Sequence, residues 1–441
     1  MTNGNPKALI PILVFVILYL GLGIVLEYGL GVKQGFYSIP VLLIFMIALA
    51  IAYLQTKADP EERFKIMGNG VGDPNVFMMI LIFLAAGVFT GIMNRAGAES
   101  VANFVLNYVP MEYAVVVLFL VSAFVSLSVG TSVGTITVLT PIAVSTSGIT
   151  GFDLALCVGT VVGGSMFGDN LSFISDTTIA ACNGQGCNMR DKFRQNFRIA
   201  LPAAIATIAL IAAMTVFSGG GSGMPGEYDL VLIIPYLVVL IGGVIGINIY
   251  IVLAAGIVTA SIVMVGTGTV DALDLFPMIS AGMGGMLETA MVAILVSAIC
   301  ALIAYNGGFD ALLSWIKNIF KGHKGGMLGI GLVVSAMDVA TANNTVAIVM
   351  ANPIAKTMAE GYGISSKTTA SLLDTFSCVM QGIVPYGAQI LIAISSVTML
   401  GFSITAFQII PYLFYPYMLL ISVLVCIFLL GNKMDERTAE A

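Results

Sequence analysis

The chain has 441 residues, of which 59% are apolar and only 9% are charged, whereas a soluble domain carries about 25% charged residues. Its mean hydropathy is +1.03, and apolar runs long enough to cross a bilayer recur from Leu9 to Leu430. This composition excludes a soluble enzyme, a nucleic-acid-binding protein and a disordered chain. The runs do not alternate with a period of two, which also excludes a transmembrane β-barrel. We therefore expect an all-α, polytopic protein embedded in a lipid bilayer.

The apolar runs recur in the same order in the two halves of the chain. A displacement of 212 residues places runs 37–55, 75–93, 114–131 and 197–217 on runs 249–267, 287–305, 326–343 and 409–429. One displacement that aligns several runs indicates an internal duplication. The expected divisions are a first repeat over residues 1–217, an extracytoplasmic linker over 218–229, a second repeat over 230–432 and a cytoplasmic tail over 433–441.

The charged residues indicate how the two repeats are oriented. The chain has 17 basic and 23 acidic residues, for a net charge of −6, and the basic residues form short clusters between the apolar runs. Basic residues gather in cytoplasmic loops, and alternating the runs leaves only Lys33 and Arg95 on the outside. The cytoplasmic set is Lys7, Lys57, Arg63, Lys65, Arg190, Lys192, Arg194, Arg198, Lys317, Lys321, Lys324, Lys356, Lys367, Lys433 and Arg437. The repeats are therefore predicted to have inverted topology, as in many secondary transporters, with both termini cytoplasmic.

Each half contains two segments that are too polar and too rich in small residues for lipid-facing helices. They are Ser126–Thr135 and Gly163–Thr178 in the first half, and Asp338–Thr345 and Asp374–Gln389 in the second. Irregular backbone at membrane depth is tolerated only where protein or a water-filled cavity surrounds it. Matched helix breaks in two repeats mark the binding sites of transporters. We therefore expect a binding site where these four segments meet.

Two of the segments resemble a known family. Residues 168–178 read Gly-Asp-Asn-Leu-Ser-Phe-Ile-Ser-Asp-Thr-Thr, which closely resembles the Gly-Asp-Lys-Leu-Ser-Pro-Leu-Ser-Asp-Thr-Thr signature of NhaC-type sodium/proton antiporters. Residues 130–135 resemble that family's Gly-Thr-Ser-Trp-Gly-Thr stretch. The resemblance implies the fold of the ion-transporter superfamily and a homodimer. In that fold each inverted repeat has a re-entrant hairpin, here with tips at 126–135 and 338–345, and a broken helix, here 163–178 and 374–389. The odd number of crossings in each repeat does not decide between such a hairpin and a crossing pair of helices over 112–150 and 324–362.

The sequence departs from the family signature at two positions. Asn170 stands where the family has lysine, and Phe173 stands where it has proline. The loss of a cation beside Asp169 changes the charge balance of the site. Chains with asparagine at this position resemble a branch labelled amino-acid permeases, with histidine among the suggested substrates. The fold is therefore better defined by the resemblance than the transported substrate is.

Asp169 is the central residue of the predicted site. Sodium prefers oxygen ligands, and a proton can compete with it for one carboxylate that is exposed to each side in turn. The residues predicted to bind the ion or the proton are Asp169, which holds the transported sodium, and Asp176, Ser172, Ser175, Thr177, Thr131, Ser132 and Asp338. The residues predicted to bind a substrate are Asn343, Asn344, Thr345, Asp374, Ser377 and Gln381. A helix N-cap is an alternative role for Asp176 and for Asp374.

These features predict a secondary active transporter and not an enzyme. The first hypothesis is sodium/proton antiport through membrane-embedded carboxylates by alternating access. The alternative is sodium- or proton-coupled transport of an amino acid, such as histidine, or of a small carboxylate, which Tyr386 and Gln389 would contact. Glu288 lies near the start of an apolar run, where a functional role and a helix-start role are both open. We expect no bound cofactor, and we expect the inner (plasma) membrane of a prokaryote as the location.

Overall fold

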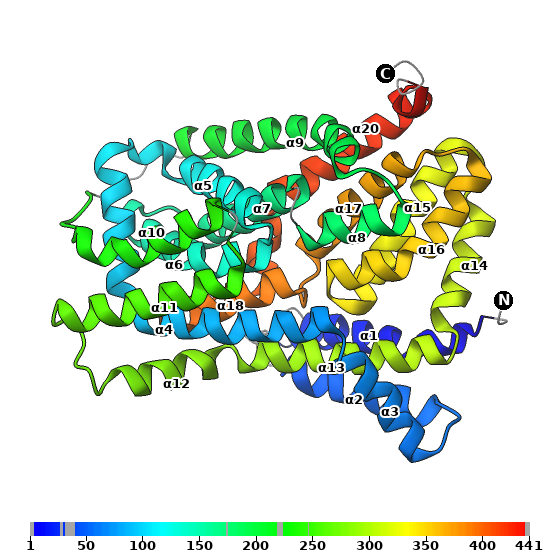
Figure 1. Ribbon diagram of the computed structural model, residues 1–441, viewed down its shortest axis with the longest axis horizontal. Helices are drawn as coiled ribbons and strands as arrows, with labels where there is room; N and C mark the ends of the chain where they lie inside the picture. Colours follow the sequence, from blue (N-terminus) through cyan, green and yellow to red (C-terminus); the bar gives the residue numbers. More distant parts are fainter. Residues whose placement is uncertain are drawn as a thin grey trace.

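The computed structural model describes residues 4–26, 30, 40–172, 175–217, 224–245 and 247–436. These residues form helices joined by short connections, and no strand occurs among them (Figure 1). Within the described residues, 10 helical segments are long and apolar enough to cross a membrane, or up to 11 if the bent pair Ala406–Tyr412 and Phe414–Leu429 is one span. The prediction of an all-α, polytopic membrane protein is confirmed.

Most of the long helices run along the long axis of the molecule (Figure 1). The first half contributes η1 (Pro6–Leu9), α1 (Ile10–Ile24), α2 (Val41–Gln55), α3 (Pro60–Val71), α4 (Pro74–Tyr108), η3 (Met111–Tyr113), α5 (Ala114–Val129), α6 (Ser132–Thr150), α7 (Leu154–Leu171), α8 (Asp176–Gln185) and α9 (Met189–Phe217). The second half contributes α10 (Leu230–Val244), α11 (Ile249–Gly266), α12 (Leu275–Gly285), α13 (Leu287–Tyr305), α14 (Gly308–Ile319), α15 (Gly322–Thr341), α16 (Asn344–Tyr362), α17 (Ser366–Ile383), α18 (Ala388–Met399), α19 (Ala406–Ile409), η4 (Ile410–Tyr412) and α20 (Phe414–Glu436).

The helix bounds repeat with the displacement found in the sequence. Moved by 212 residues, the bounds of α6, 132–150, coincide with those of α16, 344–362, and the bounds of α7, 154–171, coincide with those of α17, 366–383. Figure 1 shows the α5–α6 pair toward the left of the molecule and the α15–α16 pair toward the right. The order of elements is the one expected of a duplication. The inverted orientation of the repeats in a membrane stays a prediction.

Two helix pairs turn back at residues with a left-handed backbone. α5 ends before Gly130, which has a φ of 75°, and α15 ends before Ala342, which has a φ of 49°. Glycine adopts this conformation without steric cost, whereas alanine does so only under strain. The N–H of Ala342 donates to Asp338 O at 2.8 Å, so the strained turn still closes the end of α15. Both turns lie inside the segments predicted as hairpin tips.

The two broken helices are interrupted by short extended stretches. Ser172 leaves α7 with a ψ of 137°, and Val384 leaves α17 with a ψ of 118°. Pro385 explains the second break, because a residue before proline is biased toward extended backbone. Both breaks fall inside the segments predicted as broken helices. Phe173, which replaces the proline of the family signature, lies outside the described residues.

Helix α7 approaches α5 closely because glycine stands at the contact. A Cβ atom at Gly168 would overlap the α5 backbone at Ala123 and Leu127. We expect Gly168→Ala to destabilise the folded protein by about 1–3 kcal/mol, the usual cost of overpacking. Thermal unfolding in detergent measures this, with Gly148→Ala as the control because an added Cβ there meets nothing within 4 Å. An unchanged unfolding temperature for Gly168→Ala would contradict the close approach of the two helices.

Candidate functional site

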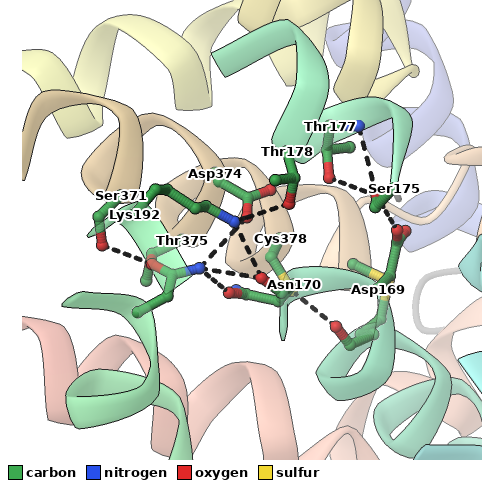
Figure 2. Close-up of polar contacts among 12 residues, drawn as sticks. Asp169, Asn170, Ser175, Thr177, Thr178, Lys192, Ser371, Asp374, Thr375 and Cys378 are labelled. Atoms are coloured by element: carbon green, nitrogen blue, oxygen red, sulfur yellow. Dashed lines mark hydrogen bonds and ion pairs between the residues drawn. The ribbon is translucent and has the colours of Figure 1, made fainter. Parts of the chain in front are cut away.

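Asp169 lies in the last turn of α7, beside the break between α7 and α8. Its carboxylate accepts hydrogen bonds from Ser132 Oγ at 2.7 Å and Ser132 N at 3.2 Å, and from Ser175 Oγ. Ser175 Oγ also lies 2.8 Å from Thr177 Oγ1, and Figure 2 shows these hydroxyl groups beside Asp169. Asp169 is only 6% exposed. Hydroxyl groups from two helix starts therefore hold a carboxylate that is largely removed from water.

A cavity of about 230 Å³, which we call the central cavity, borders Asp169. Its wall combines the α5–α6 turn, the start of α8, the α15–α16 turn and the start of α11. The polar residues of the wall are Thr131, Ser132, Asp169, Ser175, Asp176, Thr177, Asn248, Tyr250, Asn343, Asn344 and Thr345. The cavity thus brings together oxygen-bearing side chains from both halves of the chain.

Several helix ends meet at this cavity. α6 begins at Ser132 and α8 at Asp176, and the free N–H groups of a helix start favour a negative charge. α5 ends at Val129, which also lines the cavity, and the carbonyls of a helix end favour a positive charge. A carboxylate and a cation can therefore be held side by side, as they are where broken helices coordinate ions.

A chain of hydrogen bonds links Asp169 to the second half of the protein. Ser132 Oγ accepts from Gln389 Nε2 at 3.1 Å, and Gln389 Oε1 accepts from Gln381 Nε2 at 2.9 Å. Gln381 Nε2 also donates to Ala342 O, at the α15–α16 turn, over 2.8 Å. The helix breaks of the two halves are therefore connected through buried amide side chains. Gln389, considered above as a contact for an organic substrate, is one of these connecting residues.

The cavity collects most of the residues predicted to form the site. Its wall includes Asp169, Asp176, Ser175, Thr177, Thr131 and Ser132 from the ion-binding set, and Asn343, Asn344 and Thr345 from the substrate-binding set. Ser172 does not line the cavity, because its hydroxyl group donates to Leu127 O at 2.8 Å. Ser175 and not Asp176 is the N-cap of α8, so the alternative capping role of Asp176 is wrong.

Asp338 and Ser377 lie in a helix contact outside this cavity. Asp338 is 0% exposed, its Oδ1 accepts from Ser377 Oγ at 3.1 Å, and its Oδ2 has no hydrogen-bond partner. The 212-residue displacement places these residues on Ser126 and Ser165, where Ser126 Oγ donates to Ser165 O at 2.6 Å. Equivalent contacts of the two halves therefore use different side chains, and Asp338 does not line the cavity that borders Asp169.

Lys192, counted above among the basic residues of the cytoplasmic side, is buried within a helix and is not an exposed loop charge. Lys192 lies in the first turn of α9 and is 1% exposed, because its ammonium group forms an ion pair with Asp374. Its Nζ also donates to Asn170 O at 3.0 Å and to Thr178 Oγ1 at 2.8 Å (Figure 2). A charged group that is buried this completely is tolerated only when a partner of opposite charge lies beside it. Asp374 is that partner, within α17, so its alternative N-cap role is also wrong.

Asn196 completes this buried network one helical turn after Lys192. Its Nδ2 donates to Asn170 O at 3.0 Å and to Asp374 Oδ2 at 3.2 Å. Its Oδ1 accepts from Thr375 Oγ1 at 3.0 Å. The carbonyl of Asn170, which follows Asp169 in the chain, therefore accepts two hydrogen bonds from α9.

A spacing in the sequence could have revealed this part of the site. Lys192 and Asn196 are four residues apart, which places them on one helix face. The same face continues to Ile199, Ala200 and Ala203, all of which are buried. A polar pair that extends an apolar stripe predicts buried polar residues rather than loop residues.

Parts of the chain are similar to known proteins. Residues 6–219 match the model of the Na+/H+ antiporter family. The chain is 32% identical over 156 residues to an uncharacterised protein of Haemophilus influenzae, covering 35% of this chain and 30% of that protein. It is 26% identical over 173 residues to the Na+/H+ antiporter NhaC of Alkalihalophilus pseudofirmus, covering 39% of this chain and 37% of that protein. It is 23% identical over 214 residues to the malate-2H+/Na+-lactate antiporter of Bacillus subtilis, covering 48% of this chain and 45% of that protein.

The aligned segments span between 30% and 45% of the lengths of these curated relatives. The matched family and the two named antiporters confirm the resemblance to NhaC-type sodium/proton antiporters. They also point to a transporter rather than an enzyme. The matched region, residues 6–219, contains Asp169 and both segments that carry the resemblance.

Proposed function

From the match of residues 6–219 to the Na+/H+ antiporter family, we propose that the protein exchanges sodium ions for protons across a membrane. The observation that carries this proposal is the charge of the cavities. The charged residues lining the central cavity are Asp169 and Asp176, and those lining two further cavities are Asp73 and Glu288. Among the described residues, no lysine, arginine or histidine lines any of the three. Acidic walls attract a cation as the cargo and repel an anion.

Asp169 is proposed to carry the two ions in turn. An empty carboxylate is costly at membrane depth, so it changes sides with either a sodium ion or a proton bound. The hydroxyl groups of Ser132 and Ser175, which contact Asp169, are the further oxygen ligands for sodium. Gln381 occupies the equivalent position in the second half. Because the amide of Gln381 does not take up a proton, Asp169 is the only carboxylate at these two equivalent positions that could exchange a proton for sodium.

A second candidate function is sodium-coupled exchange of a small carboxylate. Asn343, Asn344 and Thr345 line the central cavity, and helix N-termini such as that of α16 bind anions readily. One relative is named a malate-2H+/Na+-lactate antiporter. Coupled transport of an amino acid such as histidine is the other form of this candidate, and the same donors would hold the amino-acid carboxylate.

The proposed arrangement in the membrane is two inverted repeats, over 1–217 and 230–432, with both termini cytoplasmic. The placement of the α5–α6 and α15–α16 pairs toward opposite ends of the molecule supports hairpins that enter from opposite sides (Figure 1). The clustered basic residues other than Lys192 support the cytoplasmic termini. A homodimer in the inner membrane of a prokaryote is proposed from the family resemblance.

Purified protein in liposomes with a trapped pH dye tests the proposal. We expect an inward sodium gradient alone to make the interior alkaline, because each sodium ion that enters drives protons out. Malate, lactate or histidine should leave the rate unchanged. Empty liposomes and an equal gradient of N-methyl-glucamine chloride are the controls. No response to sodium alone, with uptake of one labelled carboxylate or amino acid in the presence of sodium, would contradict antiport and favour the second candidate.

A further inference from the structure

The largest of the three acidic cavities lies away from Asp169. Its volume is about 660 Å³, and its wall is built from α1, α4, α12, α13, α18 and the starts of α2 and α19. Glu288 is the charged residue of this wall. The hydroxyl groups of the wall belong to Tyr19, Thr289, Ser395, Thr398 and Thr405. The cavity is therefore polar enough to hold water, and its charge is negative.

Glu288 has no basic partner in the described part of the chain. It lies in the first turn of α13 with its side chain exposed, and it forms no hydrogen bond or ion pair there. An acidic residue is favourable in the first turn of a helix, which accounts for its place on α13. The helix-start preference does not explain why this carboxylate faces a large cavity whose wall contains no basic side chain among the described residues. A cation from solution is the partner that this charge lacks.

One wall separates the Glu288 cavity from a second cavity of about 220 Å³. Thr289, the residue after Glu288, lines both cavities, and so does Leu391. Thr289 Oγ1 lies 3.0 Å from Ser395 Oγ, so a hydrogen bond between α13 and α18 forms part of the wall between the two cavities.

A second wall separates that 220 Å³ cavity from the cavity of Asp169. Met79 and Asn343 line both spaces, and Asn343 Nδ2 donates to Met79 Sδ at 3.4 Å. A hydrogen bond to a thioether sulfur is weak. Residues shared by neighbouring walls therefore place three cavities with acidic walls in series.

We propose that Glu288 is a second cation-binding residue, which collects hydrated monovalent cations in the 660 Å³ cavity before they reach Asp169. The proposal rests on the proposed function for its place on the transport path. One carboxylate in so large a space leaves the ion most of its water. The attraction is therefore electrostatic, it weakens with salt, and it does not distinguish sodium from potassium.

Glu288→Gln tests the proposal through the sodium dependence of exchange. Charge-lined clefts raise the local concentration of counter-ions by about tenfold or more, so we expect the KM for sodium to rise about tenfold at low ionic strength while kcat is unchanged. The difference should shrink to about twofold or less near 1 M N-methyl-glucamine chloride, where the Debye length is about 3 Å. Glu288→Asp should keep the low KM. Glu227→Gln, at an exposed residue that lines none of the three cavities, is the matched control.

An unchanged KM in Glu288→Gln, or a raised KM that high salt does not correct, would overturn the proposal. A second measurement does not depend on exchange. In the Asp169→Asn background, sodium and potassium should each raise the unfolding temperature relative to N-methyl-glucamine at equal ionic strength, because a ligand that binds the native state stabilises it. Adding Glu288→Gln should remove this effect. If it persists, Glu288 does not bind the cation, whether or not the protein exchanges sodium for protons.

Discussion

Asp169→Asn is expected to reduce sodium-driven proton movement to the level of empty liposomes while the protein stays folded. Asparagine has nearly the same shape, and its side-chain oxygen can still accept the hydrogen bond from Ser132. It carries no charge, and it does not take up a proton at ordinary pH. It therefore cannot alternate between a proton and a sodium ion. Initial rates from the trapped dye, with the unfolding temperature of the same preparations, measure both expectations.

The matched control for this variant is on the same helix. Asp153 is the N-cap of α7, where its carboxylate accepts from Ala155 N at 2.7 Å. Asparagine is an equally good N-cap, so Asp153→Asn should keep both the fold and the transport rate. Full exchange activity in Asp169→Asn would rule out the proposed mechanism, and loss of activity in both variants would attribute the effect to α7 rather than to the carboxylate.

The centre of the site could be predicted from the sequence because its chemistry conflicts with its surroundings. Asp169 and the hydroxyl residues around it stand in a chain that is otherwise apolar. Gly130 interrupts a helix pair in the first half, and Pro385 interrupts a helix in the second. Those local signals do not depend on which helices later pack together. The helix bounds of the four breaks accordingly fall inside the predicted segments.

The connections around Asp169 could not be predicted, because they depend on residues far apart in the chain. Lys192 and Asp374 are separated by 182 residues, and Lys192 lies in a stretch of alternating charge that looks like a loop when it is considered alone. The hydrogen bond between Gln389 and Ser132 spans 257 residues. The repeat relates equivalent positions, but it does not say which residues of one half contact the other.

Asp338 shows the limit of reasoning from residue type. An aspartate in a polar break predicts a ligand, and in the second half the same reasoning applied to Asp374. The structure surrounds Asp338 with helix contacts and pairs Asp374 with Lys192. Both carboxylates are fully buried, yet neither lines the central cavity. The residue type alone does not distinguish packing between helices from access to a cavity.

Lys192→Met is expected to destabilise the protein severely, because it leaves Asp374 buried without its counter-ion. Removing one partner of a buried ion pair costs about 3–5 kcal/mol, which is comparable with the total stability of many proteins, about 5–15 kcal/mol. The yield of monodisperse protein and its unfolding temperature in detergent measure the loss. Arg194→Met, at an exposed position of the same helix, should have little effect. A Lys192→Met protein as stable as the wild type would mean that the pair does not form.

The double variant Lys192→Met/Asp374→Asn separates stability from transport. Replacing both charges of a buried pair is often neutral, and asparagine at position 374 can still accept from Asn196 Nδ2, so we expect most of the lost stability to return. Transport should not return in full. Asn170 O loses the hydrogen bond from Lys192 Nζ, which fixes the end of α7 beside Asp169, so the KM for sodium should rise several-fold with the unfolding temperature restored. A double variant with wild-type KM would assign the ion pair to folding alone.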